Sequence, residues 1–210
     1  MKYNKNYFNL QTTKQAKLYK KYIDFIERGD IKLNNLFICD IGCATGEFIK
    51  SIYTNNSCYG VDISSYAIKS CQKKFPQIKN NFWCLDLNKQ AINKKVIFDI
   101  ITLFDVIEHL DSFIYFEKII NMNLARGGYV VITTPNANSF IRPIRKKLFT
   151  GEIDVTHKML FTPYTLDFFL RKKGLKKVKL FTPYSFFFKD NFLTQNFLFG
   201  GQIFAVYEKI

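Results

Sequence analysis

Short runs of apolar residues alternate along this chain with longer stretches in which apolar residues recur every three or four positions. The short runs predict strands, and the longer stretches predict amphipathic helices. Strands are predicted at residues 36–39, 57–61, 81–85, 98–104, 129–134, 175–182 and 202–208. Helices are predicted at residues 12–29, 44–54, 65–75, 111–124 and 163–173. Because strands and helices alternate over most of the chain, the pattern predicts an α/β fold with a mostly parallel sheet.

Residues with strong positional preferences support several of these boundaries. Ser64 and Asp111 are predicted to cap the helices that follow them, because a short polar side chain can accept a hydrogen bond from the first helical turn. Pro163 suits the first turn of a helix, whereas Pro76 and Gly174 are predicted to end the helices that precede them.

The turn after the first strand carries the first chemical signal. Asp40 follows this strand, and the loop GCATG at residues 42–46 comes before helical periodicity resumes. In an open α/β sheet such a turn lies at the carboxyl end of the strand, where ligands bind. Its glycines, Gly42 and Gly46, permit unusual backbone angles and allow a ligand to lie against the main chain.

An acidic residue at the end of the second strand points to a nucleoside. Asp62 stands sixteen residues after Gly46, and an acid at this place typically binds the hydroxyls of a ribose. The loop has the spacing G-x-x-x-G and lacks the G-x-G-x-x-G spacing that pyrophosphate binding requires. The neighbouring Asp40 suits a ligand with a positively charged end, such as the sulfonium and ammonium groups of S-adenosylmethionine.

With these motifs the chain resembles the class I S-adenosylmethionine-dependent methyltransferases over residues 36–182. The segment FDIITLFDVIEHL at residues 98–110 is a second block of resemblance. The segment DVTHKMLFTPYTLDFFLRKKGL at residues 154–175 resembles methyltransferases of ubiquinone biosynthesis and of sugar or natural-product pathways.

The resemblance implies a Rossmann-like three-layer sandwich with a seven-stranded, mostly parallel sheet and an antiparallel strand pair at its edge. It also implies a helical cap at residues 1–35 and an acceptor-specific insertion at residues 137–161. The length of 210 residues is that of one domain, so we expect a single methyltransferase domain over residues 1–210.

The resemblance further assigns residues to the cofactor, S-adenosylmethionine. Asp62 would bind the ribose, Asp86 would accept a hydrogen bond from the adenine amino group, and the backbone of Leu87 would contact the adenine ring. Asp86 has an alternative role as the N-cap of a helix at residues 88–94. The full cofactor-binding set is Asp40, Gly42, Cys43, Gly46, Asp62, Ile63, Asp86, Leu87, Leu103 and Phe104.

The chain has two histidines, and both are candidate catalytic residues. A hydroxyl acceptor must lose its proton, and histidine is the usual base near neutral pH. His157 lies in the predicted insertion and is the preferred base, with a structural hydrogen bond to Asp154 as the alternative. His109 follows the fourth strand near the expected methyl group, with a packing role at the start of a helix as its alternative.

Four residues in this region also resemble a metal-binding set. Asp105, Glu108, His109 and His157 are similar to the divalent-metal ligands of small-RNA 2′-O-methyltransferases. However, Asp105 replaces the glutamate expected there, and Leu110 replaces a second histidine. A divalent metal is therefore not expected, and no residue is assigned to one.

Composition adds information about partners and compartment. The formal net charge is +14, which suits an anionic partner, although an abundance of Lys, Asn, Ile and Phe could equally be a general compositional bias. Arg142 and Arg145 could bind a phosphate or carboxylate of the acceptor, or could belong to a solvated helix face. Without an apolar run of roughly 18 residues or an apolar signal segment, we expect no transmembrane span and a cytoplasmic location.

The five cysteines include no CxxC pair and are odd in number, so we expect buried, reduced thiols. Taken together, the sequence predicts methyl transfer to oxygen on a small molecule such as a sugar, polyketide or quinone precursor. The alternatives are an RNA methyltransferase, an NAD(P)-dependent oxidoreductase and a non-catalytic S-adenosylmethionine-binding protein. Nothing in the sequence indicates the oligomeric state.

Overall fold

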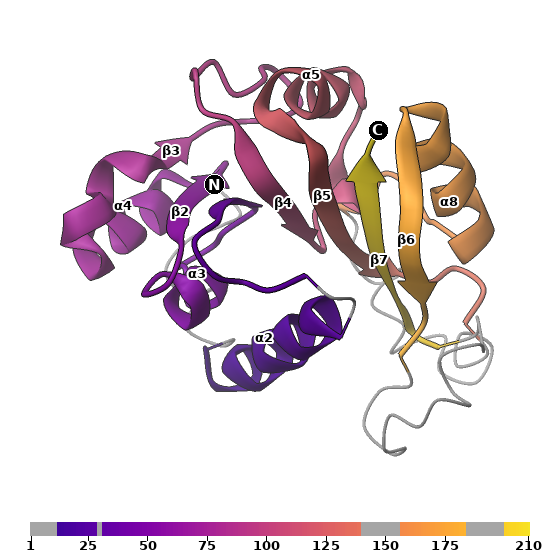
Figure 1. The fold of residues 1–210 in the computed structure, drawn as a ribbon, viewed down its shortest axis with the longest axis horizontal. Coiled ribbons are helices and arrows are strands. Elements are labelled where there is room, and N and C mark those ends of the chain that lie inside the picture. Colours follow the sequence, from indigo (N-terminus) through magenta and orange to yellow (C-terminus); the bar gives the residue numbers. More distant parts are fainter. Residues whose placement is uncertain (1–11, 29–30, 140–155, 184–199) are drawn as a thin grey trace.

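The computed structural model describes residues 12–28, 31–139, 156–183 and 200–210. Its central feature is a seven-stranded sheet with the order β3-β2-β1-β4-β5-β7-β6 (Figure 1). The strands are β1 (Phe37–Ile41), β2 (Ser57–Asp62), β3 (Phe82–Cys84), β4 (Phe98–Phe104), β5 (Leu124–Pro135), β6 (Leu175–Phe181) and β7 (Gln202–Lys209).

The directions of these strands confirm the predicted fold class. Strands β1 to β5 pair in parallel, whereas β7 runs antiparallel to both of its neighbours, β5 and β6. The antiparallel pair therefore lies at one edge of the sheet, as predicted, with β7 as the reversed strand and β6 outermost.

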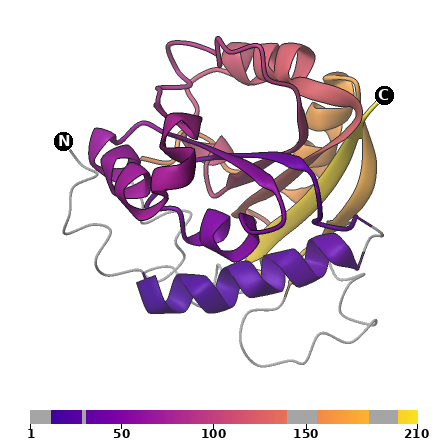
Figure 2. The ribbon, with the colours of Figure 1, turned by 60° about the vertical axis from the view of Figure 1, so that its left-hand side comes forward.

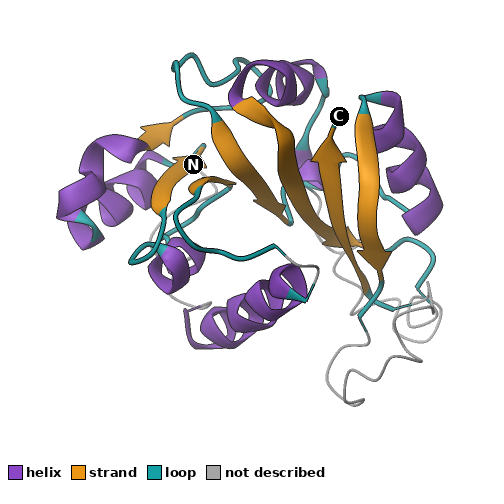
Figure 3. Ribbon diagram, viewed as in Figure 1, coloured by secondary structure: helices purple, strands orange, loops and turns teal. Residues whose placement is uncertain are grey.

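Helices cover both faces of the sheet and complete three layers (Figure 3). They are α2 (Thr12–Glu27), α3 (Glu47–Ile52), α4 (Ser65–Lys74), α5 (Ile114–Asn123) and α8 (Pro163–Lys172), with short 3-10 turns η1 (Pro76–Asn81) and η2 (Ile107–His109). The helices α2, α3 and α4 share one apolar core with one face of the sheet, and α2 lies beside α3 (Figure 2). The helices α5 and α8 form the other core.

Alternation along the strands divides the side chains between these two cores. In β4, Ile100 packs in the core on the α2 side, whereas Ile101 and Leu103 pack on the α5 side. In β1, Ile38 and Cys39 are divided in the same way. Because strands buried on both faces have no polar side, their sequences are nearly continuous apolar runs, as the sequence pattern indicated.

Several predicted caps are confirmed by hydrogen bonds. The Ser64 hydroxyl accepts from the backbone N–H of Ala67 at the start of α4. Pro163 occupies the first turn of α8, where Thr162 and Thr165 cap the helix reciprocally. Gly174 follows α8 with a φ of +77°, which suits a residue that ends a helix.

Other predicted boundaries are wrong for identifiable reasons. Asp111 does not cap a helix, because α5 begins only at Ile114 and Asp111 instead forms an ion pair with Lys158. Residues 88–94 form turns and loop, with no helix among them. The helix predicted at 44–54 begins only at Glu47, because Gly46 has a left-handed conformation with a φ of +79°.

Among the residues that the structure describes, no helix combines the length and apolar character that a membrane crossing requires.

Candidate active site

A cavity of about 420 Å³ lies at the carboxyl ends of β1, β2 and β4. This volume falls within the range of roughly 300–1,000 Å³ that is usual for small-molecule sites. Its wall includes residues that follow these strands and side chains of α2, so the N-terminal helix forms part of the site. From the predicted cofactor set, the lining residues are Gly42, Asp62, Ile63, Asp86, Leu87 and Phe104.

The loop between β1 and α3 is tightly packed against its surroundings. Gly42 has a φ of +78°, and a Cβ atom built on it would lie 2.3 Å from Cγ2 of Val106. The backbone N–H groups of Gly42 and Cys43 both donate to the carbonyl of Val61, at 2.7 and 3.0 Å. These contacts fix the loop against β2 and leave the backbone of Gly42 exposed to the cavity.

Asp62 joins the end of β2 to this loop. One carboxylate oxygen accepts from the backbone N–H of Ala44 at 2.9 Å, and the other accepts from the N–H of Ser64 at 2.7 Å. Burial raises the pKa of Asp62, and these two backbone N–H groups act in the opposite direction. Since each carboxylate oxygen has a second lone pair, Asp62 can still accept hydrogen bonds from a vicinal diol in the cavity.

Asp40 lies behind the cavity and does not line it. It is buried, and its carboxylate accepts a hydrogen bond from the Thr102 hydroxyl at 2.6 Å. Burial raises the pKa of Asp40 to about 7, despite the opposing effect of Thr102. A positively charged ligand in the cavity would favour the ionised form, because an opposite charge nearby lowers the pKa of a carboxyl group.

Asp86 and Ile63 form the end of the cavity beside β3. The side chain of Ile63 is 51% exposed, which is unusual for an isoleucine, and it borders the cavity. Asp86 accepts from the backbone N–H of Asn88 at 3.0 Å, so it orders a turn although no helix follows. An apolar surface next to a carboxylate is suitable for a flat heterocycle with an amino group.

Aromatic side chains form a further part of the cavity wall. Phe104, at the end of β4, contacts two tyrosines of α2, with ring centroids 5.8 Å from Tyr19 and 4.9 Å from Tyr22. All three rings line the cavity. The resemblance implied a helical cap at residues 1–35, but Tyr19 and Tyr22 were not among the residues assigned to the site.

Four predicted cofactor residues lie outside the cavity lining: Asp40, Cys43, Gly46 and Leu103. The Leu103 side chain is fully buried in the core on the α5 side, because it points to the opposite face of β4 from Phe104. Cys43 is buried on the α2 side of the sheet. A Cβ atom on Gly46 would lie 2.8 Å from Phe75, so this glycine permits close packing of the loop on α4.

Asp105 connects the cavity to β5 and β7. Its carboxylate accepts from the Thr133 hydroxyl at 3.1 Å and from Nε2 of Gln202 at 2.6 Å, and Gln202 in turn accepts from the Tyr22 hydroxyl at 3.2 Å. The backbone of Asp105 has a φ of +55°. Desolvation by the surrounding protein raises the pKa of Asp105. The hydrogen bonds from Gln202 and Thr133 and the nearby imidazole of His109 act in the opposite direction. This network was not predictable from the sequence, because its members are distant along the chain.

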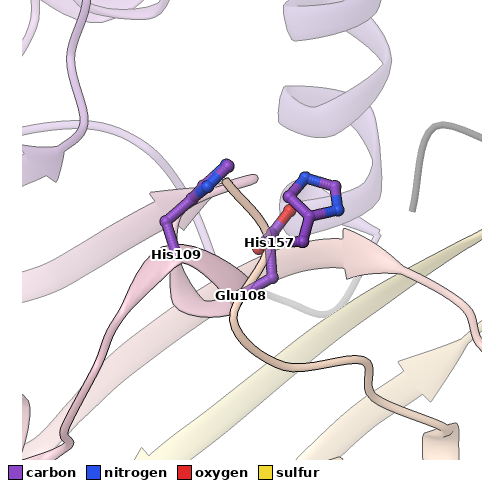
Figure 4. Close-up of side chains that lie close together, drawn as sticks. All are labelled: Glu108, His109 and His157. Carbon is purple, nitrogen blue, oxygen red and sulfur yellow. The ribbon is translucent and has the colours of Figure 1, made fainter. Parts of the chain in front are cut away.

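The two histidines lie side by side next to the cavity. Their ring centroids are 4.7 Å apart, and His109 lines the cavity. Figure 4 shows both imidazole rings and the carboxylate of Glu108 on the same side of the η2 turn. One potential ligand atom from each of these three residues lies within 4.8 Å of the other two.

Backbone hydrogen bonds hold the segment that carries His157 against this turn. The N–H groups of Lys158 and Met159 donate to the carbonyl oxygen of Glu108, at 2.8 and 3.2 Å. Nδ1 of His109 lies 3.1 Å from the carbonyl oxygen of Thr156. Two segments that are far apart in the sequence are therefore joined beside the cavity.

Three residues named in the sequence analysis lie outside the described residues. They are Arg142 and Arg145, the candidate anion-binding pair, and Asp154, the alternative partner of His157.

Comparison with known proteins identifies the family. The chain matches the family model described as a methyltransferase domain over residues 14–180. No curated protein matches the sequence.

Solved structures agree with this assignment. An S-adenosylmethionine-dependent methyltransferase from Archaeoglobus fulgidus is 23% identical, with 91% of this chain and 94% of that chain covered and a TM-score of 0.64. One from Clostridium acetobutylicum is 17% identical, with 99% and 98% covered and a TM-score of 0.68. Magnesium protoporphyrin IX methyltransferase from Synechocystis is 15% identical, with 93% and 84% covered and a TM-score of 0.64. The chain therefore belongs to the methyltransferase domain family and has the fold of the S-adenosylmethionine-dependent methyltransferases, as its motifs predicted.

Proposed function

We propose that this methyltransferase transfers the methyl group of S-adenosylmethionine to a hydroxyl oxygen of a small molecule. The observation that carries the proposal is one cavity lined by Asp62, Asp86 and His109, with the ring of His157 4.7 Å from that of His109. The Synechocystis structure contains bound S-adenosylhomocysteine, and it shares the fold of this chain.

The order of residues along the cavity supports one orientation of the donor. The adenine lies between Ile63 and Leu87, where Asp86 can accept from its amino group. The ribose hydroxyls bind Asp62, whose position is fixed by two backbone N–H groups. The methionine portion then passes Gly42, where the absence of a side chain leaves room, and the methyl group reaches Phe104 and the histidines.

The histidine pair supports oxygen as the atom that receives the methyl group. In the transfer, the C–S bond breaks with its electron pair remaining on sulfur, an O–C bond forms, and the acceptor hydroxyl loses its proton. A neutral imidazole at the end of the cavity can accept that proton. Because the sulfonium is already a good leaving group, the position of the two reactants accounts for most of the remaining acceleration.

In this proposal the acceptor binds next to the segment that carries His157. We propose that residues 137–161 select the acceptor, that α2 forms the cap of the site, and that residues 1–210 form one domain. A net charge of +14 supports an anionic acceptor, with Arg142 and Arg145 as its proposed anchors. A sugar, polyketide or quinone precursor with a phosphate or carboxylate group meets this description.

The test begins with binding of S-adenosylhomocysteine by calorimetry, with NADH as the comparison ligand. We expect one molecule of S-adenosylhomocysteine per chain and no binding of NADH. Labelled S-adenosylmethionine is then incubated with matched hydroxyl and amine acceptors, and the methylated atom is identified by mass spectrometry. Transfer only to amines would contradict the proposed oxygen chemistry. Methylation of RNA, with an affinity that falls steeply with salt, would contradict a small-molecule acceptor.

A further inference from the structure

We propose that the outer face of α5 and α8 binds a membrane surface that contains anionic lipids. These two helices cover the side of the sheet opposite to α2, α3 and α4, and their outer face carries both exposed apolar and exposed basic side chains. The residues of this face do not line the cavity, so the proposal does not depend on which acceptor is methylated.

The two helices lie side by side and run in the same direction. The rings of Phe113 and Phe169 have centroids 4.3 Å apart, and this contact joins the start of α5 to α8. Four residues further along each segment, Glu117 forms an ion pair with Lys173. Because the two contacts follow in the same order in both segments, the helices are parallel, and these four residues form the seam between them.

Helical geometry places the residues beside this seam on one outward face. Successive residues of an α-helix are about 100° apart around the axis. Ile114 follows the seam residue Phe113 of α5, whereas Phe168 precedes the seam residue Phe169 of α8. On two parallel helices, these opposite rotations turn both side chains to the same side. The core residues of both helices turn the other way, toward the sheet.

Large apolar side chains are exposed on these helices. Apart from Ile210, the most exposed large apolar residues that the structure describes all belong to α5 and α8, and they are Tyr164 (77% exposed), Met122 (61%), Ile114 (59%) and Phe168 (57%). Single exposed apolar residues are common on protein surfaces, but a group of them on adjacent elements is typical of an interaction surface.

Two lysines extend the same face. Lys118 follows Ile114 by four residues and Lys172 follows Phe168 by four residues, so each lies on the outward face of its helix and is exposed. Neither lysine forms an ion pair with a residue that the structure describes. Instead, the Lys172 ammonium lies 5.5 Å from the ring centroid of Phe168, and that of Lys118 lies 5.3 Å from the ring centroid of Tyr115. Both positive charges are therefore available to a partner.

The acids of the two helices are already paired with basic residues. Each helix contains one acid, Glu117 in α5 and Asp167 in α8. Glu117 pairs with Lys173 in the seam. Asp167 lies 3.8 Å from Arg171 and 3.3 Å from Lys177. The outer face therefore has an excess of positive charge, and such a surface is attracted to anionic lipid headgroups.

The side chains of this face favour a lipid surface over other partners. Aliphatic side chains such as Ile114 and Met122 can enter the boundary between headgroups and acyl chains, whereas single-stranded RNA requires aromatic rings that stack on bases. A second copy of this chain would bring the same lysines together and would add a further net charge of +14, which opposes association. An anionic bilayer accommodates the apolar groups and the lysines at once.

The experiment measures co-sedimentation of the tag-free protein with two kinds of lipid vesicle. One contains phosphatidylcholine alone, and the other contains equal parts of phosphatidylcholine and phosphatidylglycerol. The variants are Phe168→Ser and Lys172→Gln. Their matched controls are Tyr53→Ser and Lys73→Gln, because these exposed residues belong to the end of α3 and to α4, on the other side of the sheet. Circular dichroism verifies that each variant is folded.

We expect the wild type and both controls to bind the mixed vesicles, with little binding to phosphatidylcholine alone. Binding should weaken as salt rises, because salt screens the attraction between exposed charges. Lys172→Gln should weaken binding about fivefold, which is the contribution of one lysine near an anionic surface. Phe168→Ser should weaken it at least about tenfold, because the apolar ring no longer leaves water.

Three results would overturn the proposal. The first is failure of the wild type to bind the mixed vesicles. The second is an equal loss of binding in the variants and in their controls, which would assign the binding to the net charge of the whole chain. The third is vesicle binding that Phe168→Ser and Lys172→Gln leave intact while they weaken binding of a single-stranded RNA oligonucleotide or abolish a dimer detected by sedimentation.

Failure of this surface is distinguishable from failure of the proposed function. Methyl transfer is measured without vesicles on acceptors in solution, and Phe168→Ser and Lys172→Gln should leave it unchanged because neither residue lines the cavity. Vesicle binding is measured without S-adenosylmethionine, so its outcome does not depend on the reaction.

Discussion

Replacement of Gly42 by alanine should destabilise the protein through a defined steric conflict. The new Cβ would lie 2.3 Å from Cγ2 of Val106, whereas real Cβ atoms essentially never approach another heavy atom within 3.0 Å. The residue also has a φ of +78°, at which any residue with a side chain is strained. The left-handed conformation costs roughly 1–2 kcal/mol, and overpacking adds roughly 1–3 kcal/mol.

Gly127→Ala provides the matched control for this substitution. Gly127 has a similar φ of +72°, but a Cβ atom there would have no neighbour within 4 Å. Both variants lose the same backbone freedom in the unfolded chain, so the difference between them isolates the collision with Val106. We expect Gly42→Ala to be the less stable of the two by about 1–3 kcal/mol.

Urea unfolding followed by circular dichroism measures this difference, and calorimetry with S-adenosylhomocysteine measures the effect on the site. The double variant Gly42→Ala with Val106→Ala should recover part of the lost stability, because it removes the colliding methyl group. Equal stabilities of Gly42→Ala and Gly127→Ala, or independent effects in the double variant, would show that the loop yields without cost and would refute the reasoning.

Three further predictions concern the acids and the histidine pair. Asp62→Ala should weaken S-adenosylhomocysteine binding at least about 100-fold in calorimetry, because two charge-assisted hydrogen bonds of about 1.5 kcal/mol or more each are lost; unchanged affinity would contradict the ribose assignment. His157→Ala should leave that affinity unchanged and lower turnover of a hydroxyl acceptor by roughly 10²- to 10⁴-fold, and an equal loss of binding would argue for a structural role instead. The pKa of Asp40 is about 7 in the folded protein and near its ordinary value when unfolded, so the folded state binds the extra proton and its stability falls as pH rises from about 4 to 7. The urea midpoint of Asp40→Asn should lose less over this range than that of the wild type, and parallel pH profiles would contradict the raised pKa.

The sequence predicted the parts of the fold that depend on local pattern. The apolar runs predicted the strands, and β4 has the predicted limits of residues 98–104. The glycine loop and Asp62 were recognised because their spacing along one strand-turn-helix unit is a local property. Family membership, and the fold that it implies, are confirmed by the comparisons.

Contacts between distant segments were not predictable in this way. Asp111 resembled a helix cap, but its position opposite Lys158 follows from how residues 156–159 pack on η2. The hydrogen bonds of Tyr22, Gln202 and Asp105 unite α2, β7 and the end of β4. No short sequence window contains such a set, and only the folded sheet brings its members together.

Which alternating face a side chain occupies also decides its role. Leu103 and Phe104 are neighbours in the sequence and were both assigned to the cofactor. The pleat of β4 directs Leu103 into the core on the α5 side and Phe104 toward α2. Phe104 lines the cavity, but the direction of each side chain could be known only from the register of the sheet.

The attachment of residues 156–159 to η2 depends on main-chain atoms, since the Lys158 and Met159 amides both donate to one carbonyl oxygen. These backbone hydrogen bonds do not depend on the side chains of residues 158 and 159. If residues 137–161 select the acceptor and His157 takes its proton, as proposed above, substitutions that change the acceptor can accumulate without displacing the imidazole of His157. In evolutionary terms, specificity and chemistry could then change separately.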